Sequence, residues 1–160
     1  MRLISLLVIL VCAIASAQSR TSKNLDIYVV DVEGGNATLF VSPSGESLLI
    51  DTGNAGAAAP RDAGRIIEAM KGAGLTKIDH LITTHWHGDH FGGMAELASK
   101  VQIGEFIDHG PNVQPGEAAD TFLQKVYPQL YAKSKHTVVK PGTKSLSREW
   151  MCAWSHRRAK

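Results

Sequence analysis

The sequence predicts a domain of the α/β class, in which strands alternate with helices. Short runs of β-branched and aromatic residues, bounded by glycine, proline and asparagine, recur between residues 25 and 141. Apolar residues recur at helical spacing over residues 60–72 and again over residues 118–133. Strands interleaved with helices indicate an α/β architecture, and 160 residues are enough for one such domain.

The first part of the domain is expected to be a β-meander. Its three strands are predicted over residues 25–30, 37–41 and 47–50. Glycine-rich and proline-containing turns separate them, at residues 33–36 and 42–45. The third strand ends at Asp51-Thr52-Gly53-Asn54, which reads as a polar loop at the carboxyl end of a strand.

The next part alternates helices with strands. Pro60 suits the first turn of a helix, and Asp62 complements the positive end of its dipole. One face of this helix is apolar, through Ala63, Ile66, Ile67 and Met70. The later elements are a strand over 78–84, a short helix over 94–100, a strand within 101–108, a helix over 118–133 and a strand over 137–139. Pro128 is expected to kink or split the last helix.

The first 17 residues have the layout of a secretory signal peptide. Met1-Arg2 is followed by an almost wholly apolar run over residues 3–14 and by the small residues Ala15-Ser16-Ala17. The alternative is a membrane anchor, but the run is shorter than the roughly 20 residues of a spanning helix. We therefore expect cleavage after Ala17, a secreted or periplasmic protein, and no membrane attachment after cleavage. Cys152 is then the one remaining cysteine, which excludes an intramolecular disulfide.

Charge is unevenly distributed along the chain. Residues 18–140 hold 11 Lys and Arg against 14 Asp and Glu, a net charge of −3, which argues against a nucleic-acid-binding surface. Residues 141–160 hold 5 Lys and Arg against 1 Glu, a net charge of +4. The tail over residues 143–160 also departs from the preceding pattern, with Trp150, Trp154 and Cys152 together. A frameshift or wrong gene end would explain this change, and an ordinary variable C-terminus is the alternative.

A cluster of metal-ligating residues follows the strand predicted over 78–84. His85 and His87 are two positions apart, so a strand that ends and turns there can present both to one metal. Asp89 and His90 follow in the next turn, where they can hold a second metal, and Gly88 allows a tight turn between the pairs. Nitrogen and oxygen donors of this kind favour zinc, one ion or two. The alternatives are a polar surface loop and a purely structural zinc, but structural sites are usually rich in cysteine.

The pattern His-x-His-x-Asp-His over residues 85–90 resembles the signature of the metallo-β-lactamase superfamily. Asp51-Thr52-Gly53 is similar to the aspartate element that precedes this signature in that family, one helix and one strand earlier. The segment from Asp31 to Ala37, together with Asp79-His80 and Gly92-Gly93, looks closest to hydrolases related to competence-type DNA-uptake proteins. The resemblance extends over residues 25–141, close to the first half of such a domain.

The resemblance implies a fold, a site and a reaction class. The fold would be the N-terminal half of a four-layer αββα sandwich, comprising residues 18–142, with the metals at one edge between two sheets. His85 and His87 would ligate the first zinc, and Asp89 and His90 the second. Asp51 would orient ligands through hydrogen bonds. Asp89 would also assist proton transfer when the second site is empty. A zinc-activated water would attack an ester, amide or phosphoester of a small-molecule substrate.

The sequence departs from the family pattern after His90. The family completes its site with a third histidine, a bridging aspartate and a late histidine from its second half, and here only 70 residues follow His90. We expect His109 to be a hydrogen-bonded loop residue, His136 to be solvated surface, and His156 to belong to the atypical tail. These observations predict a truncated chain with one sheet face uncovered and with low or no activity. The alternatives are a non-catalytic metal-binding fragment and a nuclease-like relative of DNA-uptake proteins.

Overall fold

A computed structural model of the chain describes residues 24–114 and 116–143. The predicted signal peptide and residues 144–160 of the predicted tail therefore lie outside the described residues, as do Cys152 and His156. No helix in the described part of the chain is long and apolar enough to cross a membrane.

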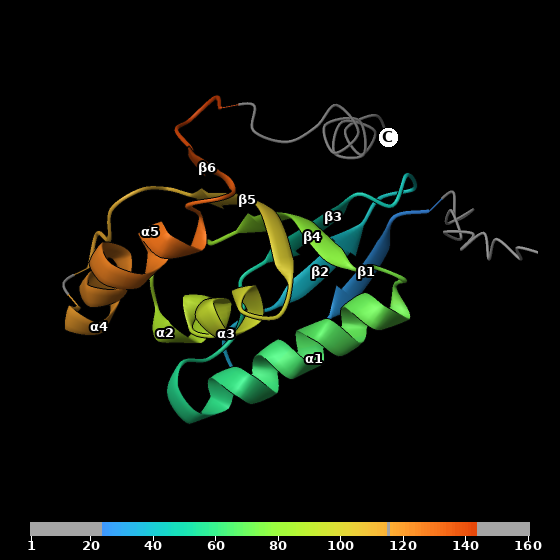
Figure 1. Ribbon diagram of the computed structural model, residues 1–160, viewed down its shortest axis with the longest axis horizontal. Coiled ribbons are helices and arrows are strands. Elements are labelled where there is room, and N and C mark those ends of the chain that lie inside the picture. The colour runs from blue at the N-terminus through green and yellow to red at the C-terminus, as the bar shows by residue number, and fades with distance from the viewer. Residues whose placement is uncertain (1–23, 115, 144–160) are drawn as a thin grey trace, which may run out of the picture.

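The described strands form one sheet of six, and their order in the sheet is their order in the sequence (Figure 1). They are β1 (Asp26–Val29), β2 (Thr38–Val41), β3 (Ser47–Ile50), β4 (Lys77–Ile82), β5 (Gln102–Asp108) and β6 (Lys135–Val138). The first three pair antiparallel because short turns join them, and this confirms the predicted meander. The last three pair parallel to their neighbours because each is reached through helical segments, as parallel pairing requires.

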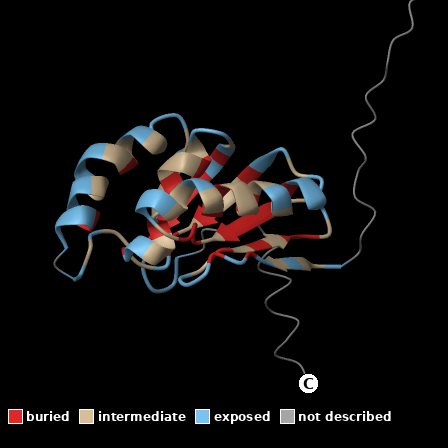
Figure 2. Cartoon of the chain, turned by 90° about the horizontal axis from the view of Figure 1, so that it is seen from below, coloured by how far each residue is buried: buried red, intermediate tan, exposed pale blue. Residues whose placement is uncertain are grey.

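The helices cover one face of this sheet (Figures 1 and 2). They are the 3-10 turn η1 (Gly56–Ala58), α1 (Ala59–Gly72), α2 (Gly88–Phe91), α3 (Met94–Ala98), α4 (Glu117–Thr121), the π-helical segment η2 (Phe122–Val126) and α5 (Tyr127–Leu130). The helix predicted over residues 118–133 is split into the last three of these segments. Pro128 lies in the first turn of α5, where its missing N–H costs least, so the break comes in the π-helical segment before it.

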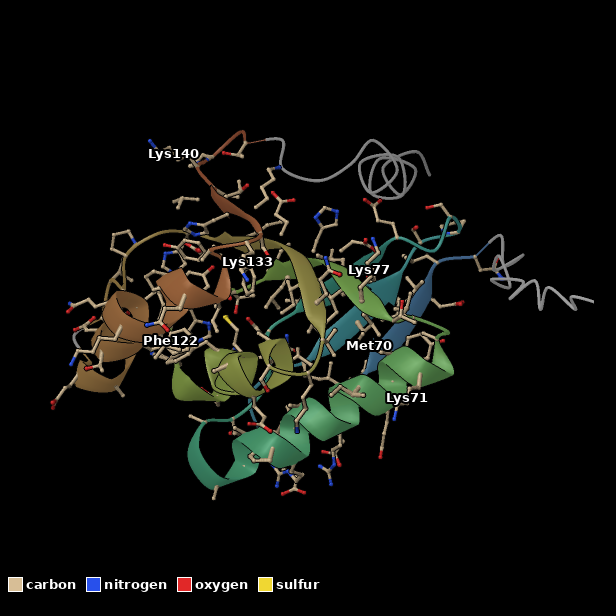
Figure 3. All side chains as sticks on the ribbon, in the orientation of Figure 1. Met70, Lys71, Lys77, Phe122, Lys133 and Lys140 are labelled. Atoms are coloured by element: carbon tan, nitrogen blue, oxygen red, sulfur yellow. The ribbon has the colours of Figure 1, made fainter. Side chains whose placement is uncertain are left out.

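The core lies between the sheet and the helices. Leu39, Leu49, Leu81 and Phe106 form one row across β2 to β5, and all are at most 1% exposed. Met70 of α1 points toward this row, whereas Lys71, the next residue, points away from it (Figure 3). Burial of one such side chain stabilises the fold by about 1.5–3 kcal/mol. The apolar positions that predicted α1 therefore also fix which face of α1 meets the sheet.

The other face of the sheet is covered by no described helix. Ile27 and Val29 of the edge strand β1 are 49% and 82% exposed. Farther along the same face, Glu105 accepts hydrogen bonds from Thr137 at 2.6 Å and Lys135 at 2.7 Å, and it contacts His80 Nδ1 at 2.9 Å. The expected uncovered sheet face is thus present only toward β1, because Glu105 and Ile107 on the same face are 4% and 2% exposed.

Candidate metal centre

The histidine motif lies where β4 leaves the sheet and turns into α2. His87 has extended backbone angles and is the residue that precedes the first turn of α2, so His85 and His87 lie in extended chain. Asp89 and His90 lie within α2, whose turn is closed by the bond from His90 N to His87 O at 2.9 Å. The change from extended to helical backbone falls between the two pairs, which adjoin each other because the ring centroids of His85 and His90 are 4.0 Å apart.

The first pair joins His85 and His87. His85 Nε2 and His87 Nδ1 lie 3.0 Å apart, and the two ring centroids are 4.5 Å apart. The Thr84 hydroxyl donates to Asp51 Oδ2 at 2.7 Å, so its oxygen is free to accept from His85 Nδ1 at 3.1 Å. The hydrogen-bond network of Thr84 therefore assigns the His85 proton to Nδ1, and the lone pair on Nε2 faces His87.

The second pair joins Asp89 and His90. The carboxylate of Asp51 only accepts, so His90 Nδ1 must donate to it across their 2.8 Å contact. In the neutral ring this leaves a lone pair on His90 Nε2, which lies 3.6 Å from Asp89 Oδ2. The second pair thus brings together an imidazole nitrogen and a carboxylate oxygen, which are both metal-ligating atoms.

Asp51 is the buried centre of this arrangement. It is 1% exposed, and it accepts hydrogen bonds from Thr84 N at 2.8 Å and from Asn36 Nδ2 at 3.2 Å, besides the Thr84 hydroxyl and His90. Its backbone is in the left-handed region with φ of 62°, an uncommon conformation for a residue with a side chain. Such strain is maintained only where the surrounding contacts over-determine it.

Close backbone packing holds the motif against the loop that follows β3. Thr52 N donates to His90 O at 2.7 Å, and Gly92 N donates to Gly53 O at 3.0 Å. A Cβ atom at Gly92 would overlap the backbone nitrogen of Ala55, and one at Gly93 would overlap Thr52 O. The absence of a side chain at Gly92 and Gly93 therefore admits the loop that follows Asp51.

We expect Gly92→Ala to lower the free energy of unfolding by about 2–3 kcal/mol, because the new methyl group must displace backbone atoms. The backbone angles of Gly92 are helical, so no dihedral penalty contributes. The matched control is Gly64→Ala in α1, where nothing lies within 4 Å of the added Cβ. That change should stabilise the chain by about 0.5–1 kcal/mol. Urea denaturation measures both, and equal stability of the two variants would contradict the packing described here.

Asp62 supports the same loop from α1. Its buried carboxylate accepts from Asn54 N at 2.8 Å, from Asn54 Nδ2 at 3.0 Å and from Arg61 Nε at 2.8 Å. Burial alone would raise the pKa of Asp62, but these hydrogen bonds and the Arg61 charge hold that pKa below its ordinary value of 3.8.

A carboxyl group with a lowered pKa in the folded state stabilises the fold above its unfolded pKa, and this contribution disappears as the pH falls through the folded value. We therefore expect the unfolding free energy to decrease as the pH falls below about 4. The decrease should be shallower in Asp62→Asn, which no longer titrates at this position. Urea denaturation at a series of acidic pH values measures the slopes, and parallel slopes in the two chains would count against this role for Asp62.

The donor set suits zinc in kind and in spacing. Two nitrogens bound to one tetrahedral zinc at about 2.0–2.1 Å lie roughly 3.3 Å apart, close to the separation in the first pair. Burial, and then the neighbouring His90 and His87, lower the pKa of His85, which favours the neutral imidazole that binds metal. Within residues 24–114 and 116–143, however, no group of three or more His, Cys, Asp or Glu side chains is placed to hold a metal ion. The donors therefore converge as two pairs.

The other histidines in the described part of the chain lie outside this cluster. The ring of His109 lies against Trp86, with centroids 6.3 Å apart. His136 was expected to be solvated surface, and this prediction was wrong. Its Nε2 bonds Asp108 Oδ2 at 2.7 Å, and its ring stacks on Tyr131 at 4.1 Å. Sequence reasoning placed it by its lysine-rich neighbours, but β6 brings it beside the buried end of β5.

The Asp108 carboxylate also accepts from Tyr127 Oη at 2.7 Å and from Gly110 N at 2.6 Å. Burial, and then the hydrogen bond to Asp108, raise the pKa of Tyr127. Asp108, Tyr127 and His136 line one end of a cavity of about 330 Å³ between β5, β6 and the segments from α4 to α5. Asp120 of α4 also lines this cavity and is exposed.

Three contributors to the site were not predicted as such from the sequence. Thr84 bonds both Asp51 and His85, Asn36 bonds Asp51, and Gln114 Oε1 contacts His87 Nε2. The position of Thr84 directly before the motif was a usable signal for its role. Gln114 lies 27 residues beyond His87, and no spacing rule connects them.

Comparison with known proteins places the chain in one protein family. The sequence profile of the metallo-beta-lactamase superfamily matches residues 30–142. Lactamase-like protein notP of Aspergillus sp. (strain MF297-2) is 40% identical over 63 residues, which are 39% of this chain and 18% of that protein. An atrochrysone carboxyl ACP thioesterase of Aspergillus fumigatus is 38% identical over 63 residues, 39% of this chain and 14% of that protein.

Solved structures give matches of similar extent. The subclass B3 metallo-beta-lactamase MEM-A1, isolated from a soil metagenome library, is 29% identical, with a TM-score of 0.41, over 51% of this chain and 29% of that chain. Rm3 metallo-beta-lactamase is also 29% identical, with a TM-score of 0.41, over 51% of this chain and 28% of that chain. In all four cases the match spans less than a third of the other protein's length.

Proposed function

The chain belongs to the metallo-beta-lactamase superfamily, and from that premise we propose that it is a zinc-dependent hydrolytic domain. The observation that carries this proposal is the close pairing of metal-ligating atoms in the histidine motif. His85 Nε2 lies 3.0 Å from His87 Nδ1, and His90 Nε2 lies 3.6 Å from Asp89 Oδ2. A zinc ion would take the place of the shared proton in each pair, and imidazole with carboxylate suits zinc.

Each residue of the motif then has a defined task. His85 and His87 would hold one zinc ion, and Asp89 and His90 would hold a second where two are bound. Asp51 would keep the His90 ring in place through its 2.8 Å hydrogen bond. When bound, zinc would acidify a water molecule and polarise the group under attack. The Asp89 side chain is 47% exposed, so its carboxylate would be accessible to take up a proton when the second pair holds no metal.

We propose a small molecule with an ester, thioester or amide bond as the substrate. The thioester is the first to test, because a relative 38% identical over 63 residues is named as an ACP thioesterase. A phosphodiester represents the nuclease-like alternative and has weaker support, since residues 18–140 carry a net charge of −3. We also propose export, on the pattern of residues 1–17 alone. Mass spectrometry of the secreted protein would test it, with Gln18 expected as the first residue.

Turnover assays test the hydrolytic proposal. The zinc-loaded chain would be assayed with an acyl thioester, nitrocefin and a phosphodiester, each beside the chain treated with a chelator. We expect thioester hydrolysis that is lost with the chelator and restored by zinc. No turnover of any of the three substrates by the zinc-loaded chain would contradict it.

A second candidate function is a metal-binding domain without catalysis. It is favoured by the finding that no described group of three or more side chains is placed to hold a metal ion. In that case the chain would bind zinc through the same residues and would show no turnover. Zinc content and turnover measured on one sample separate the two functions.

A further inference from the structure

The loop after β5 is attached to the histidine motif at both of its ends. At one end, the Trp86 indole donates to Gly110 O at 2.7 Å. At the other end, Gln114 Oε1 contacts His87 Nε2. Trp86 and His87 are consecutive, so this loop, residues 110–114, lies beside His87 of the first pair.

The loop is built to hold Gln114 in place. Gly110 has φ of 92°, which turns the chain sharply after β5, and its N–H bonds Asp108 Oδ1 at 2.6 Å. Gln114 N donates to Asn112 Oδ1 at 3.2 Å, and Asn112 Nδ2 donates back to Gln114 O. Reciprocal bonds of this kind, from an asparagine to the backbone two residues on, fix a turn. The backbone of Gln114 is therefore constrained although its side chain is exposed.

The contact from Gln114 to His87 has a chemical consequence. An amide oxygen accepts hydrogen bonds and cannot donate them, so His87 must carry its proton on Nε2. The neutral ring then has its lone pair on Nδ1, the atom that lies 3.0 Å from His85 Nε2. The opposite tautomer would carry its proton on Nδ1, would donate it to His85 Nε2 across this contact, and would so close the first pair to a metal.

We propose that Gln114 is a positioning residue, which holds His87 in the tautomer that presents Nδ1 to a metal. The proposal rests on the metal-binding function inferred above, but the tautomer it assigns is a property of the metal-free chain. Thr84 and Asp51 fix the tautomers of His85 and His90 through hydrogen bonds of the same kind. With Gln114, each of the three histidines has a partner that fixes its tautomer. Partners of this kind change metal affinity by about 10–100-fold when removed.

The test compares Gln114→Leu, which is similar in size but accepts no hydrogen bond, with Gln114→Glu, which still accepts. Gln124→Leu is the matched control, because Gln124 is an exposed glutamine of η2 that lines the neighbouring cavity. Nitrogen-15 NMR of histidine-labelled, metal-free chain reports which His87 nitrogen carries the proton. Zinc affinity is measured on the same four proteins by competition with a chelating dye.

We expect His87 to be protonated on Nε2 in the wild-type chain, in Gln114→Glu and in the control. In Gln114→Leu we expect a mixture of tautomers and a zinc affinity about 10–100-fold lower. An unchanged His87 tautomer in Gln114→Leu would overturn the proposal. A wild-type chain that binds no zinc would instead refute the proposed function, and the NMR result would still decide the role of Gln114.

Discussion

Replacing His85 with alanine is expected to abolish tight zinc binding by the chain. His85 supplies one of the two nitrogens of the first pair, and its Nε2 lies 3.0 Å from His87 Nδ1. Removal of a ligand should lower the zinc affinity by more than the roughly 10–100-fold decrease that follows removal of a residue hydrogen-bonded to a ligand. Competition with a chelating dye measures the affinity directly.

The matched control for this prediction is His109→Ala. His109 is also a partly exposed loop histidine, but its ring lies against Trp86 and not within the ligand pairs. We expect the zinc affinity of the His109→Ala chain to stay within about threefold of the wild-type value, a difference in binding free energy below about 1 kcal/mol. Equal loss of affinity in His85→Ala and His109→Ala would show that the first pair is not the binding site.

Asp51→Asn should have the largest combined effect on stability and on metal binding. Asparagine tolerates the left-handed backbone at this position, so the change isolates the carboxylate. Its amide group turns one acceptor into a donor, which must then face Thr84 or His90, both of which donate to Asp51. An unsatisfied buried donor costs about 1–3 kcal/mol. We expect a loss of that size in urea denaturation and a zinc affinity lower by about 10–100-fold.

Asp31→Asn serves as the control for Asp51→Asn. The Asp31 side chain is 77% exposed and pairs with Arg65 at 3.5 Å on the surface. Exposed pairs of this kind contribute at most about 1 kcal/mol, so stability and zinc affinity should both remain near the wild-type values. Should Asp51→Asn behave like this control, the buried network around Asp51 would have no role in either property.

The strands and helices could be predicted closely because their residues carry local signals. The strand predicted over residues 47–50 is β3 with the same bounds, and the helix that begins near Pro60 is α1. The π-helical segment η2 was not predicted, since it depends on how Phe122 and its neighbours pack against Trp86 and Phe91. Tertiary contacts of this kind leave no periodic trace in the sequence.

The candidate metal ligands could be predicted from the sequence, but most of the residues that hydrogen-bond to them could not. His85, His87, Asp89 and His90 are adjacent in sequence, and the structure places them as the two expected pairs, although their role as ligands stays a prediction. Their partners Asn36 and Gln114 come from other loops, and only folding brings them together. The role of His136 was misjudged for the same reason, because Asp108 approaches it across the sheet.

Zinc content shows whether the histidine motif is a metal centre. Wild-type chain and the double variant His85→Ala/His87→Ala would be stripped of metal, dialysed against zinc and then against metal-free buffer, and analysed by atomic emission. We predict at least one zinc ion per wild-type chain and none above background in the double variant. A wild-type chain that retains no more zinc than the double variant would contradict the assignment of the histidine motif as a metal centre.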